Sequence, residues 1–271
     1  MEDNIMNWKK AVALGIVAVG AVSLFTGCGN STNNSNSSSK PNKIIAGLDD
    51  TFAPMGYRDD NGQIIGFDVD MARAIGKEIG VEIEFKPIDW GSKETELSSG
   101  RIDCIWNGLS MTPERKEKMD FTNPYMNNDQ VYVVLNDSSY QSAEDLKGKN
   151  VCGQEGSTGE AAMNANEELK NSFAQFKTYP EFTSCYMDLD AGRMDAVVVD
   201  SVMADYYMTK VPNKYRVLPG NVAREQFGVA VKKGNEELVK LLNDGMKKVI
   251  DSGEASQISN KWFKRDAIAK A

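Results

Sequence analysis

The segment IWNGLSMTPER, residues 105–115, places an amide, a hydroxyl and an arginine close together directly after an apolar run. Within it, Thr112 can cap a helix, Pro113 suits the first helical position and Glu114 favours the positive end of the helix. Arg115 would then lie on the first turn, where its guanidinium can reach back and hold a carboxylate with two parallel N–H bonds. The alternative is an ordinary ion pair at the surface.

A second candidate anion site is the segment GQEGSTGEAA, residues 153–162. Three glycines lie close together, and Ser157 and Thr158 lead into an expected helix whose free N–H groups attract anions. The segment lacks the lysine and the spacing of a P-loop. We therefore expect a small carboxylate here rather than a phosphate.

Two acidic residues and two aromatic residues complete the candidates. Asp49 follows the apolar run IIAGL and Asp200 follows AVVV, so each could bind a cation at the end of a strand. Either could instead cap a turn, which is a common role of aspartate. Phe52 and Trp90 could form a pocket wall, although burial in the core is the usual place for such side chains.

Strand-like and helical patterns alternate along the chain from residue 43 onward. The clearest helix is 66–80, where apolar residues recur every fourth position and Gly80 suits a C-cap. Repeated strand and helix units predict an α/β fold with parallel sheets covered on both faces. The expected strands are 43–48, 81–85, 102–106, 131–135, 150–153, 195–199 and 227–231, and the other expected helices are 158–170, 183–192, 201–210 and 235–252.

The chain contains one internal similarity. Segments 99–108 (SGRIDCIWNG) and 191–201 (AGRMDAVVVDS) share Gly, Arg, an apolar residue and Asp before an apolar strand. The simplest explanation is that Gly ends a helix and Asp opens a strand, but two such units also suit two similarly built lobes. Because open sheets bind ligands beyond the carboxyl ends of their strands, residues 107–110 would face Asp200 and Ser201 across a cleft.

Composition limits the class of protein. The 271 residues are 41% hydrophobic, enough for one large or two modest cores. The formal net charge is -8 and the basic residues are scattered, so we expect no nucleic-acid partner. There is no histidine, which counts against an enzyme and excludes every zinc site that contains histidine.

The amino terminus has the features of an export signal, which we assign to 1–27. A basic start precedes the apolar run 11–25, which is shorter than the roughly 20 residues of a membrane span. LFTGC resembles the lipobox of bacterial lipoproteins, in which the cysteine, here Cys28, becomes the lipidated first residue. The alternative is a secreted chain that merely contains a cysteine here. Residues 28–42 predict a disordered tether, and Met6 is an alternative start.

Three further cysteines cannot all pair with one another. Cys104 lies in an expected strand and is most simply a small core residue. Cys152 and Cys185 could form a disulfide in an oxidising environment, but their spacing does not decide the question.

The segment GFDVDMARAIGKEI resembles the signature of the bacterial family 3 extracellular solute-binding proteins, the receptors of polar amino acid ABC importers. The resemblance extends from about residue 43 to 263 and includes DDTFAP, IDWGSKETELSSGRID, NGLSMTPER and GSTGE. It implies an α/β periplasmic-binding-protein fold of type II, the Venus flytrap, with two hinge crossings. Lobe 1 would comprise 43–127 plus 226–271, and lobe 2 would comprise 128–225.

The resemblance also implies roles for the candidates at the head group of an amino acid. Arg115 would bind the α-carboxylate, with help from Thr158 and Ser110. Asp200 would bind the α-ammonium group together with the carbonyl of Gly108. The two opposite charges would lie on different lobes, so that a bridging ligand favours closure.

Side-chain recognition is implied for five further residues. Phe52 and Trp90 would sandwich the ligand side chain, while Asp49, Asn107 and Gln154 would contact its tip. Some relatives carry a second hydroxyl where this chain has Asn107 followed by glycine, so the preferred side chain stays open. Asp49 with two aromatic rings suits a basic amino acid, whereas the two amides suit an amide side chain or cystine.

We therefore expect a monomeric lipoprotein on the extracytoplasmic face of the cell membrane. It would deliver a free polar amino acid to an ABC permease, without a cofactor, a metal or a catalytic residue. One alternative is a periplasmic-type dehydratase acting on arogenate or prephenate, with Glu155 or Asp49 as the acid. Another is a surface adhesin or sensor domain.

Overall fold

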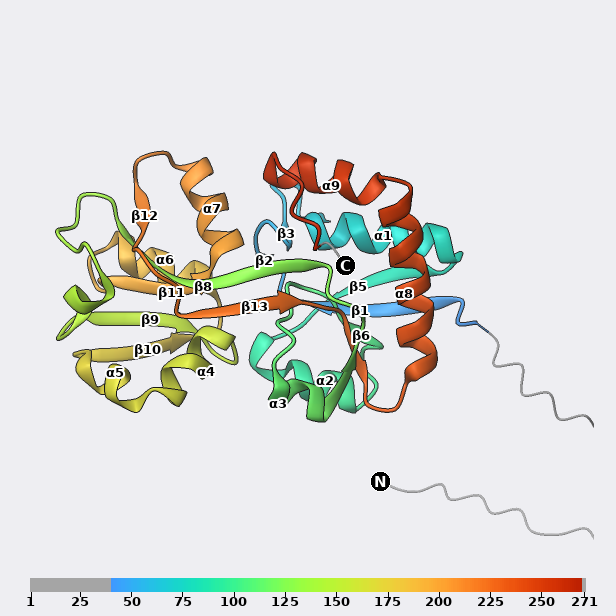
Figure 1. Cartoon of the computed structure of the whole chain (residues 1–271), viewed down its shortest axis with the longest axis horizontal. Helices are drawn as coiled ribbons and strands as arrows, with labels where there is room; N and C mark the ends of the chain where they lie inside the picture. Colours follow the sequence, from blue (N-terminus) through green and yellow to red (C-terminus); the bar gives the residue numbers. More distant parts are fainter. Residues whose placement is uncertain (1–39, 270–271) are drawn as a thin grey trace, which may run out of the picture. The chain divides into compact units, whose positions relative to one another are not determined.

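The computed structural model describes residues 40–269 of the chain (Figure 1). Cys28, the export signal and most of the expected tether lie outside the described residues. No helix within the described range combines the length and the apolar character that a membrane crossing requires. The same range contains no group of three or more His, Cys, Asp or Glu side chains that could hold a metal ion.

The elements of lobe 1, our name for the part built around the first sheet, are β1 (Lys43–Leu48), β2 (Thr51–Phe52), β3 (Gly56–Arg58), β4 (Ile64–Ile65), α1 (Phe67–Ile79), β5 (Glu82–Pro87), η1 (Trp90–Ser92), α2 (Lys93–Ser98), β6 (Cys104–Ile105), α3 (Pro113–Lys118), β7 (Met119–Phe121), β14 (Ala230–Lys232), α8 (Glu236–Asp251) and α9 (Glu254–Phe263). Their main sheet has the order β5-β1-β6-β14-β7. A small antiparallel sheet has the order β2-β3-β4. Helix α1 packs against α8 and α9.

The elements of lobe 2, built around the second sheet, are β8 (Met126–Leu135), η2 (Ala143–Leu146), β9 (Asn150–Gln154), α4 (Thr158–Ala165), α5 (Glu167–Ser172), β10 (Gln175–Tyr179), α6 (Phe182–Asp190), β11 (Ala196–Asp200), α7 (Ser201–Lys210), β12 (Tyr215–Val217) and β13 (Ala223–Phe227). This sheet has the order β10-β9-β11-β8-β12, with β13 paired to β8. Helices α4, α6 and α7 contact β11.

Both main sheets are covered on both faces, as expected. In β11, Val197 and Val199 pack into one cluster of buried side chains, whereas Ala196 and Val198 pack into another. All four are fully buried. Because successive side chains of a strand point to opposite faces, a strand buried on both sides is apolar throughout. This explains the unbroken run AVVV before Asp200.

The expectation of parallel sheets is met only in part, because both sheets are mixed. Strands β1, β5 and β6 are parallel, as are β9, β10 and β11. Strand β14 is antiparallel to β6, and β8 is antiparallel to β11. These two strands belong to the segments that pass between the lobes, and neither follows a helix that covers the sheet. Antiparallel pairing is possible there because it needs no helical crossover.

Strands β8 and β13 form a two-stranded ribbon between the lobes. They pair antiparallel from Ala223 opposite Gln130 to Phe227 opposite Met126. Figure 1 shows β8 in green and β13 in orange running side by side from one lobe to the other. The chain therefore passes between the lobes through two segments that are bonded to each other.

Most expected elements are confirmed, and several differ in extent, including strand 102–106, of which only Cys104–Ile105 is a strand. Strand 43–48 and helix 201–210 have the predicted bounds, and α1 ends at Gly80 in the left-handed conformation. The expected helix 158–170 is two helices, because Asn166 ends α4 and its side chain caps α5. The expected strand 227–231 is likewise two strands, and strand 131–135 is the second half of the longer β8.

The two similar segments have the same local structure. Asp103 precedes β6, and its carboxylate accepts the N–H of Ile45 at 2.7 Å, while Asp195 precedes β11 and accepts the N–H of Asn150 at 2.8 Å. In both segments the glycine before the arginine has a positive φ, 74° at Gly100 and 69° at Gly192. The shared pattern is therefore a repeated device that ends a helix and fastens the next strand to its parallel neighbour.

The three cysteines within the described residues are free thiols, and all are buried. The sulfur of Cys185 lies 3.4 Å from the carbonyl oxygen of Gly153, and that of Cys152 lies 3.6 Å from the carbonyl oxygen of Ala196. Burial raises the pKa of the Cys104 thiol. All three behave as small core residues.

Asp68 has a different role from the one its helical position predicts. It stands in the first turn of α1 but is buried, and its carboxylate accepts the N–H of Gly108 at 2.6 Å and the hydroxyl of Tyr125 at 3.0 Å. Burial raises the pKa of Asp68 to about 7, against the opposing effect of these two hydrogen bonds. Asp68 thus fastens the turn after β6 to α1.

The buried Asp68 predicts a specific pH dependence of stability. Between about pH 4 and pH 7 the folded protein keeps a proton that the unfolded chain has released, so this group's contribution to stability falls as the pH rises. Asp68→Asn removes the titration. The free energy of unfolding of the variant, relative to wild type, should increase by up to about 1.4 kcal/mol per pH unit over this range.

Urea unfolding of both proteins between pH 4 and pH 7 measures the effect. Asp244→Asn, at an exposed position of α8, is the control for the loss of a carboxylate. A wild-type protein and an Asp68→Asn variant with parallel pH profiles would contradict the prediction.

Candidate functional site

A small cavity lies where the strand ends of the two lobes meet. Every residue that lines it was among the sequence-derived candidates. The residues are Phe52, Trp90, Asn107, Gly108, Ser110, Arg115, Gln154, Ser157, Thr158 and Asp200. Asp49, the remaining candidate, is bonded to two of them. The structure therefore brings the candidates together, and their binding of a ligand stays a prediction.

Arg115 lies at one end of the cavity and is only 8% exposed. Thr112 caps α3 as expected, because its hydroxyl accepts the N–H of Arg115 at 3.2 Å. The guanidinium donates from Nη1 to the carbonyl of Ser110 and from Nη2 to the carbonyl of Gly156, both at 3.0 Å. Burial lowers the pKa of Arg115, and nearby carboxylates, Glu225 first, oppose that shift. A buried cation of this kind suits an anionic group.

The segment before α4 lies beside Arg115 and has the expected helix start. Ser157 caps α4 by accepting the N–H of Glu160 at 3.1 Å, and the Glu160 carboxylate accepts the N–H of Gly156 at 2.6 Å. The first N–H groups of a helix have no partner within it. Thr158, the first residue of α4, lines the cavity, so its end of the helix faces the same space as Arg115.

Lys93 is a second buried cation near Arg115 that sequence reasoning missed. Its Nζ atom donates to the carbonyl of Trp90 at 3.0 Å and to the carbonyl of Gly156 at 2.9 Å. The Gly156 carbonyl in lobe 2 therefore accepts hydrogen bonds from two cations of lobe 1. Burial, reinforced by the charge of Arg115, lowers the pKa of Lys93 to about 7.

Asp200 lies on another side of the cavity, at the end of β11, and is 5% exposed. Its carboxylate accepts Asn128 Nδ2 at 2.7 Å and Gln130 Nε2 at 2.8 Å. Burial raises the pKa of Asp200 well above its usual range, and the negative charge of Glu225 adds to the rise. Such a carboxylate suits a cationic group that would lower its pKa again.

The residues predicted to contact a side chain form a third group. Asp49 accepts Gln154 Nε2 at 2.6 Å and the hydroxyl of Thr51 at 2.7 Å, and its own N–H donates to Asn107 Oδ1 at 3.1 Å. Burial raises the pKa of Asp49, while its hydrogen bonds to Thr51 and Gln154 oppose that shift. The Nδ2 atom of Asn107 is buried without a partner among the described residues. It is therefore an available donor beside the cavity.

Aromatic rings and a glycine shape the wall of the cavity. Phe52 and Trp90 both line it, and the Phe52 ring lies 5.9 Å from that of Phe182. Gly108 has φ 55°, which places its backbone close to Phe52. Glu155, one of the two acids considered for a dehydratase, is exposed and does not line the cavity.

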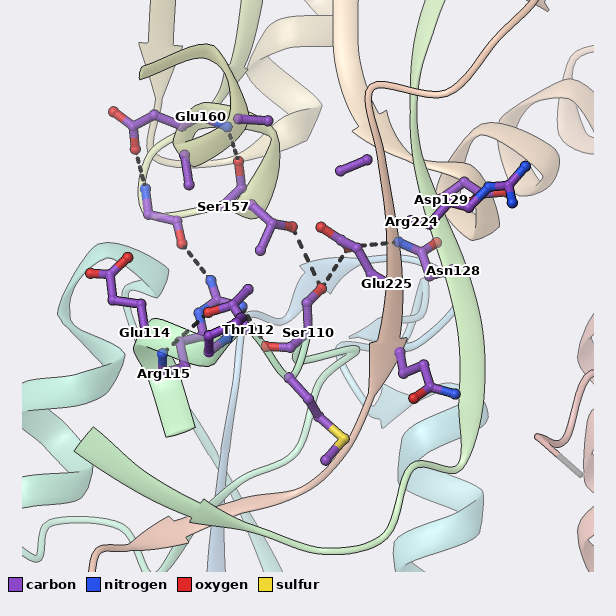
Figure 2. A pocket seen from close by; sticks show the side chains of 18 of the residues that line it. Ser110, Thr112, Glu114, Arg115, Asn128, Asp129, Ser157, Glu160, Arg224 and Glu225 are labelled. Carbon is purple, nitrogen blue, oxygen red and sulfur yellow. Dashed lines mark hydrogen bonds between the residues drawn. The ribbon is translucent and has the colours of Figure 1, made fainter. Parts of the chain in front are cut away.

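Three polar residues on the ribbon between the lobes were also missed. Asn128 and Gln130 stand two residues apart on β8, so both point to the same face, and Glu225 lies on the paired β13. Figure 2 shows Glu225 beside Ser110 and Asn128 at the edge of the site. The segment NNDQ before the apolar run VYVVL was a usable signal, because four consecutive polar residues stand there directly before an expected strand.

The chain is similar to known proteins over most of its length. Residues 44–265 match the family model described as "Bacterial extracellular solute-binding proteins, family 3". The L-cystine-binding protein TcyJ of Escherichia coli (strain K12) is 34% identical over 225 residues, covering 82% of this chain and 83% of the relative. The arginine-binding extracellular protein ArtP of Bacillus subtilis (strain 168) is 32% identical over 251 residues, covering 92% of this chain and 96% of the relative.

A solved structure is similar over the same region. It is that of an ABC uptake transporter substrate-binding protein from Streptococcus pneumoniae with bound histidine. The TM-score is 0.82 at 40% identity, covering 84% of this chain and 95% of that chain. The likeness confirms the predicted two-lobed α/β periplasmic-binding-protein fold.

The left-handed turn at Gly108 predicts a loss of stability on substitution. In Gly108→Ala the new Cβ atom would lie 2.8 Å from Phe52 Cε1, in addition to the backbone cost of φ 55°. Gly62→Ala is the matched control, because Gly62 has φ 76° and no atom within 4 Å of the added Cβ. The control should lose about 1–2 kcal/mol of unfolding free energy, and Gly108→Ala about 1–3 kcal/mol more. Equal losses in chemical unfolding would contradict a close contact with Phe52.

Proposed function

The chain belongs to the bacterial extracellular solute-binding proteins of family 3, and we propose that it captures a free amino acid with a basic or amide side chain, or cystine, for an ABC permease. The observation that carries the proposal is the single cavity lined by both Arg115 and Asp200. One is a buried cation on lobe 1, the other a buried anion on lobe 2. A zwitterion offers the complementary pair of charges on one carbon atom.

Arg115 binds the α-carboxylate in this proposal. Its two terminal nitrogens donate to backbone carbonyls, and a carboxylate is a stronger acceptor because it is charged. Thr158, at the start of α4, adds a hydroxyl and the positive end of a helix on the opposite side. Ser110 lies between them, its hydroxyl 3.5 Å from that of Thr158.

Asp200 binds the α-ammonium group, together with the carbonyl of Gly108. The site favours a charged amine there, because a cation relieves the cost of burying the Asp200 carboxylate. An ammonium group has three N–H donors and no acceptor, so it needs several acceptors around it. The amides of Asn128 and Gln130 hold the Asp200 carboxylate in place for this contact.

The far end of the cavity selects the side chain. Phe52 and Trp90 offer aromatic faces, which attract cations as well as apolar groups. Asp49 supplies a buried carboxylate, and Asn107 and Gln154 supply amides. This combination favours a basic side chain through charge and an amide side chain through hydrogen bonds. Of the relatives named above, one is named as a cystine-binding protein and one as an arginine-binding protein, and the solved structure contains bound histidine.

Capture proceeds by closure of the two lobes around the ligand. Hydrogen bonds already join the lobes at the cavity, among them those from Arg115 to Gly156, from Lys93 to Gly156 and from Gln154 to Asp49. A ligand that contacts both lobes adds bonds that exist only in the closed form and so shifts the equilibrium toward it. The permease then recognises that form.

The chain acts as a monomer anchored to the extracytoplasmic face of the membrane. In this proposal a lipid on Cys28 and the tether 28–42 hold lobes 1 and 2, with the expected bounds 43–127 plus 226–271 and 128–225. The support is the lipobox-like LFTGC and the uncharged polar stretch that follows it.

A thermal-shift screen tests the ligand class. We expect one or more of arginine, lysine, ornithine, histidine, glutamine, asparagine and cystine to raise the melting temperature. At a ligand concentration 100 times Kd the gain is about 2.7 kcal/mol, or roughly 5–10 °C for a protein of this size. The screen covers the twenty amino acids plus cystine and ornithine. If none of them shifts the transition, the proposed function is wrong.

Substitution of Arg115 tests the carboxylate site. Arg115→Ala should weaken binding of the best amino acid by about 2–5 kcal/mol, because a desolvated carboxylate loses its partner. Arg115→Lys should bind with intermediate affinity, since it keeps the charge but not the paired donors. Arg101→Ala, an exposed arginine paired with Glu96, is the control and should change little. Calorimetry that gives Arg115→Ala near wild-type affinity would remove this residue from the site.

A further inference from the structure

We propose that Glu225 is a second anionic partner of the ligand's ammonium group, and that with Asp200 it makes the site select a free amine. This inference rests on the proposed function and extends it to a residue on the ribbon between the lobes. Glu225 lies on β13, outside the strand ends and motifs from which the other site residues were identified.

The Glu225 carboxylate is held at the edge of the cavity by three donors from both lobe 1 and the ribbon. Its Oε2 atom accepts the hydroxyl of Ser110 at 2.7 Å, Asn128 Nδ2 at 3.1 Å and Gln130 Nε2 at 3.2 Å. Glu225 also lines the larger groove that adjoins the cavity, together with Ser110, Arg115 and Thr158 (Figure 2). The side chain is therefore fixed in direction at the boundary between the groove and the cavity, since Ser110, Arg115 and Thr158 line both.

Glu225 and Asp200 share their amide donors. Asn128 Nδ2 lies 2.7 Å from Asp200 and 3.1 Å from Glu225, and Gln130 Nε2 lies 2.8 Å and 3.2 Å from the same two carboxylates. Two carboxylates on the same neutral donors repel one another. The negative charge of Glu225 accordingly raises the pKa of Asp200 further. A pair arranged in this way gains most from a cation placed against both members.

The position for a cation against both carboxylates is left to the ligand, as the charged groups that face Glu225 show. They are Asp200, at the end of β11, and Arg115, on α3, for which Glu225 is the strongest nearby charge. The side chains of β8 and α4 that lie nearest to Glu225 and Asp200 are neutral: Asn128, Gln130 and Thr158. The charged Asp129 and Glu160 of the same two elements also line the larger groove, and Glu160 is bonded to the N–H of Gly156. Figure 2 shows Arg224 and Asp129, the charged neighbours on the ribbon, pointing away from Ser110 and Glu225.

The charges of the site and the ligand then balance only if the ligand carries an amine. Once a ligand carboxylate pairs with Arg115, the charge of that cation is balanced by the ligand, and the ligand's ammonium group supplies a cation for the two acids. Its three N–H donors match three acceptors: Asp200, the Gly108 carbonyl and Glu225. A carboxylic acid with the same side chain but no amine would leave the buried Asp200 and the half-buried Glu225 without that cation, which is costly.

The test is a cycle in which the amine and the Glu225 charge are removed separately and together. The probes are L-arginine and 5-guanidinopentanoic acid, its analogue without the α-amine, and likewise L-glutamine and 4-carbamoylbutanoic acid. Wild type and Glu225→Gln are titrated with each by calorimetry, with the weak analogues measured by displacement. Glu237→Gln, exposed on α8, is the control for the change in net charge.

We expect Glu225→Gln to weaken binding of the amino acid about 10- to 100-fold, the range of one charged hydrogen bond. Binding of the deaminated analogue should change less than about threefold on the same reasoning, because it lacks the group that Glu225 contacts. Glu237→Gln should bind all probes as wild type does. Glu225→Asp should regain part of the affinity, which separates the charge from the fold of the ribbon.

Two results would overturn the inference alone. They are unchanged amino acid affinity in Glu225→Gln, and equal losses for the amino acid and its analogue, which would mean that Glu225 only supports the ribbon. A wild-type protein that binds neither arginine nor glutamine, and no other amino acid in the thermal screen, would overturn the proposed function and this inference with it.

Discussion

The burial of the Arg115 guanidinium is the constraint around which the site is built. A buried charge costs several kcal/mol unless hydrogen bonds and opposite charges compensate it. The compensation here comes from both lobes: the carbonyl of Ser110 on one side, the carbonyl of Gly156 on the other, and the carboxylates of Asp200 and Glu225 nearby. The lobes must therefore approach each other for Arg115 to be satisfied. In the proposed function a small molecule with a carboxylate and an amine uses the same groups to join the lobes.

The scaffold positions these charges with a few repeated devices. In each lobe an aspartate at the start of a strand accepts a backbone N–H from the neighbouring parallel strand, Asp103 in lobe 1 and Asp195 in lobe 2. Each of these strands then ends at the cavity, where the chain turns. In lobe 1 the turn is further fastened to α1 through Asp68 and Gly108. The site thus rests on sheet edges rather than on long loops, which limits how far its polar groups can move.

Sequence reasoning reached most of this arrangement because its signals are local. Apolar spacing identified α1, the pattern Thr-Pro-Glu-Arg identified the start of α3, and the strand-end rule placed Asn107 and Asp200 at one edge. It failed where a role depends on distant residues. Lys93 reads as an ordinary polar residue of a short helix. Its role depends on a hydrogen bond from its amine to the Gly156 carbonyl, which is 63 positions away in the sequence. Glu225 likewise needs β8 beside it, and the antiparallel strands of the mixed sheets depend on passages between lobes that no local pattern marks.

The ribbon of β8 and β13 has a mechanical consequence. Two separate single strands would let the lobes slide, twist and tilt independently. A hydrogen-bonded ladder resists sliding, so the easiest remaining motion is bending across its plane. The polar groups beside the cavity stand on the same ribbon, so a substitution there changes both its stiffness and the lining of the candidate site. The response speed of a sensor built on this scaffold could therefore be adjusted by substituting residues on the outward faces of the ladder of β8 and β13, with its inward amides left unchanged.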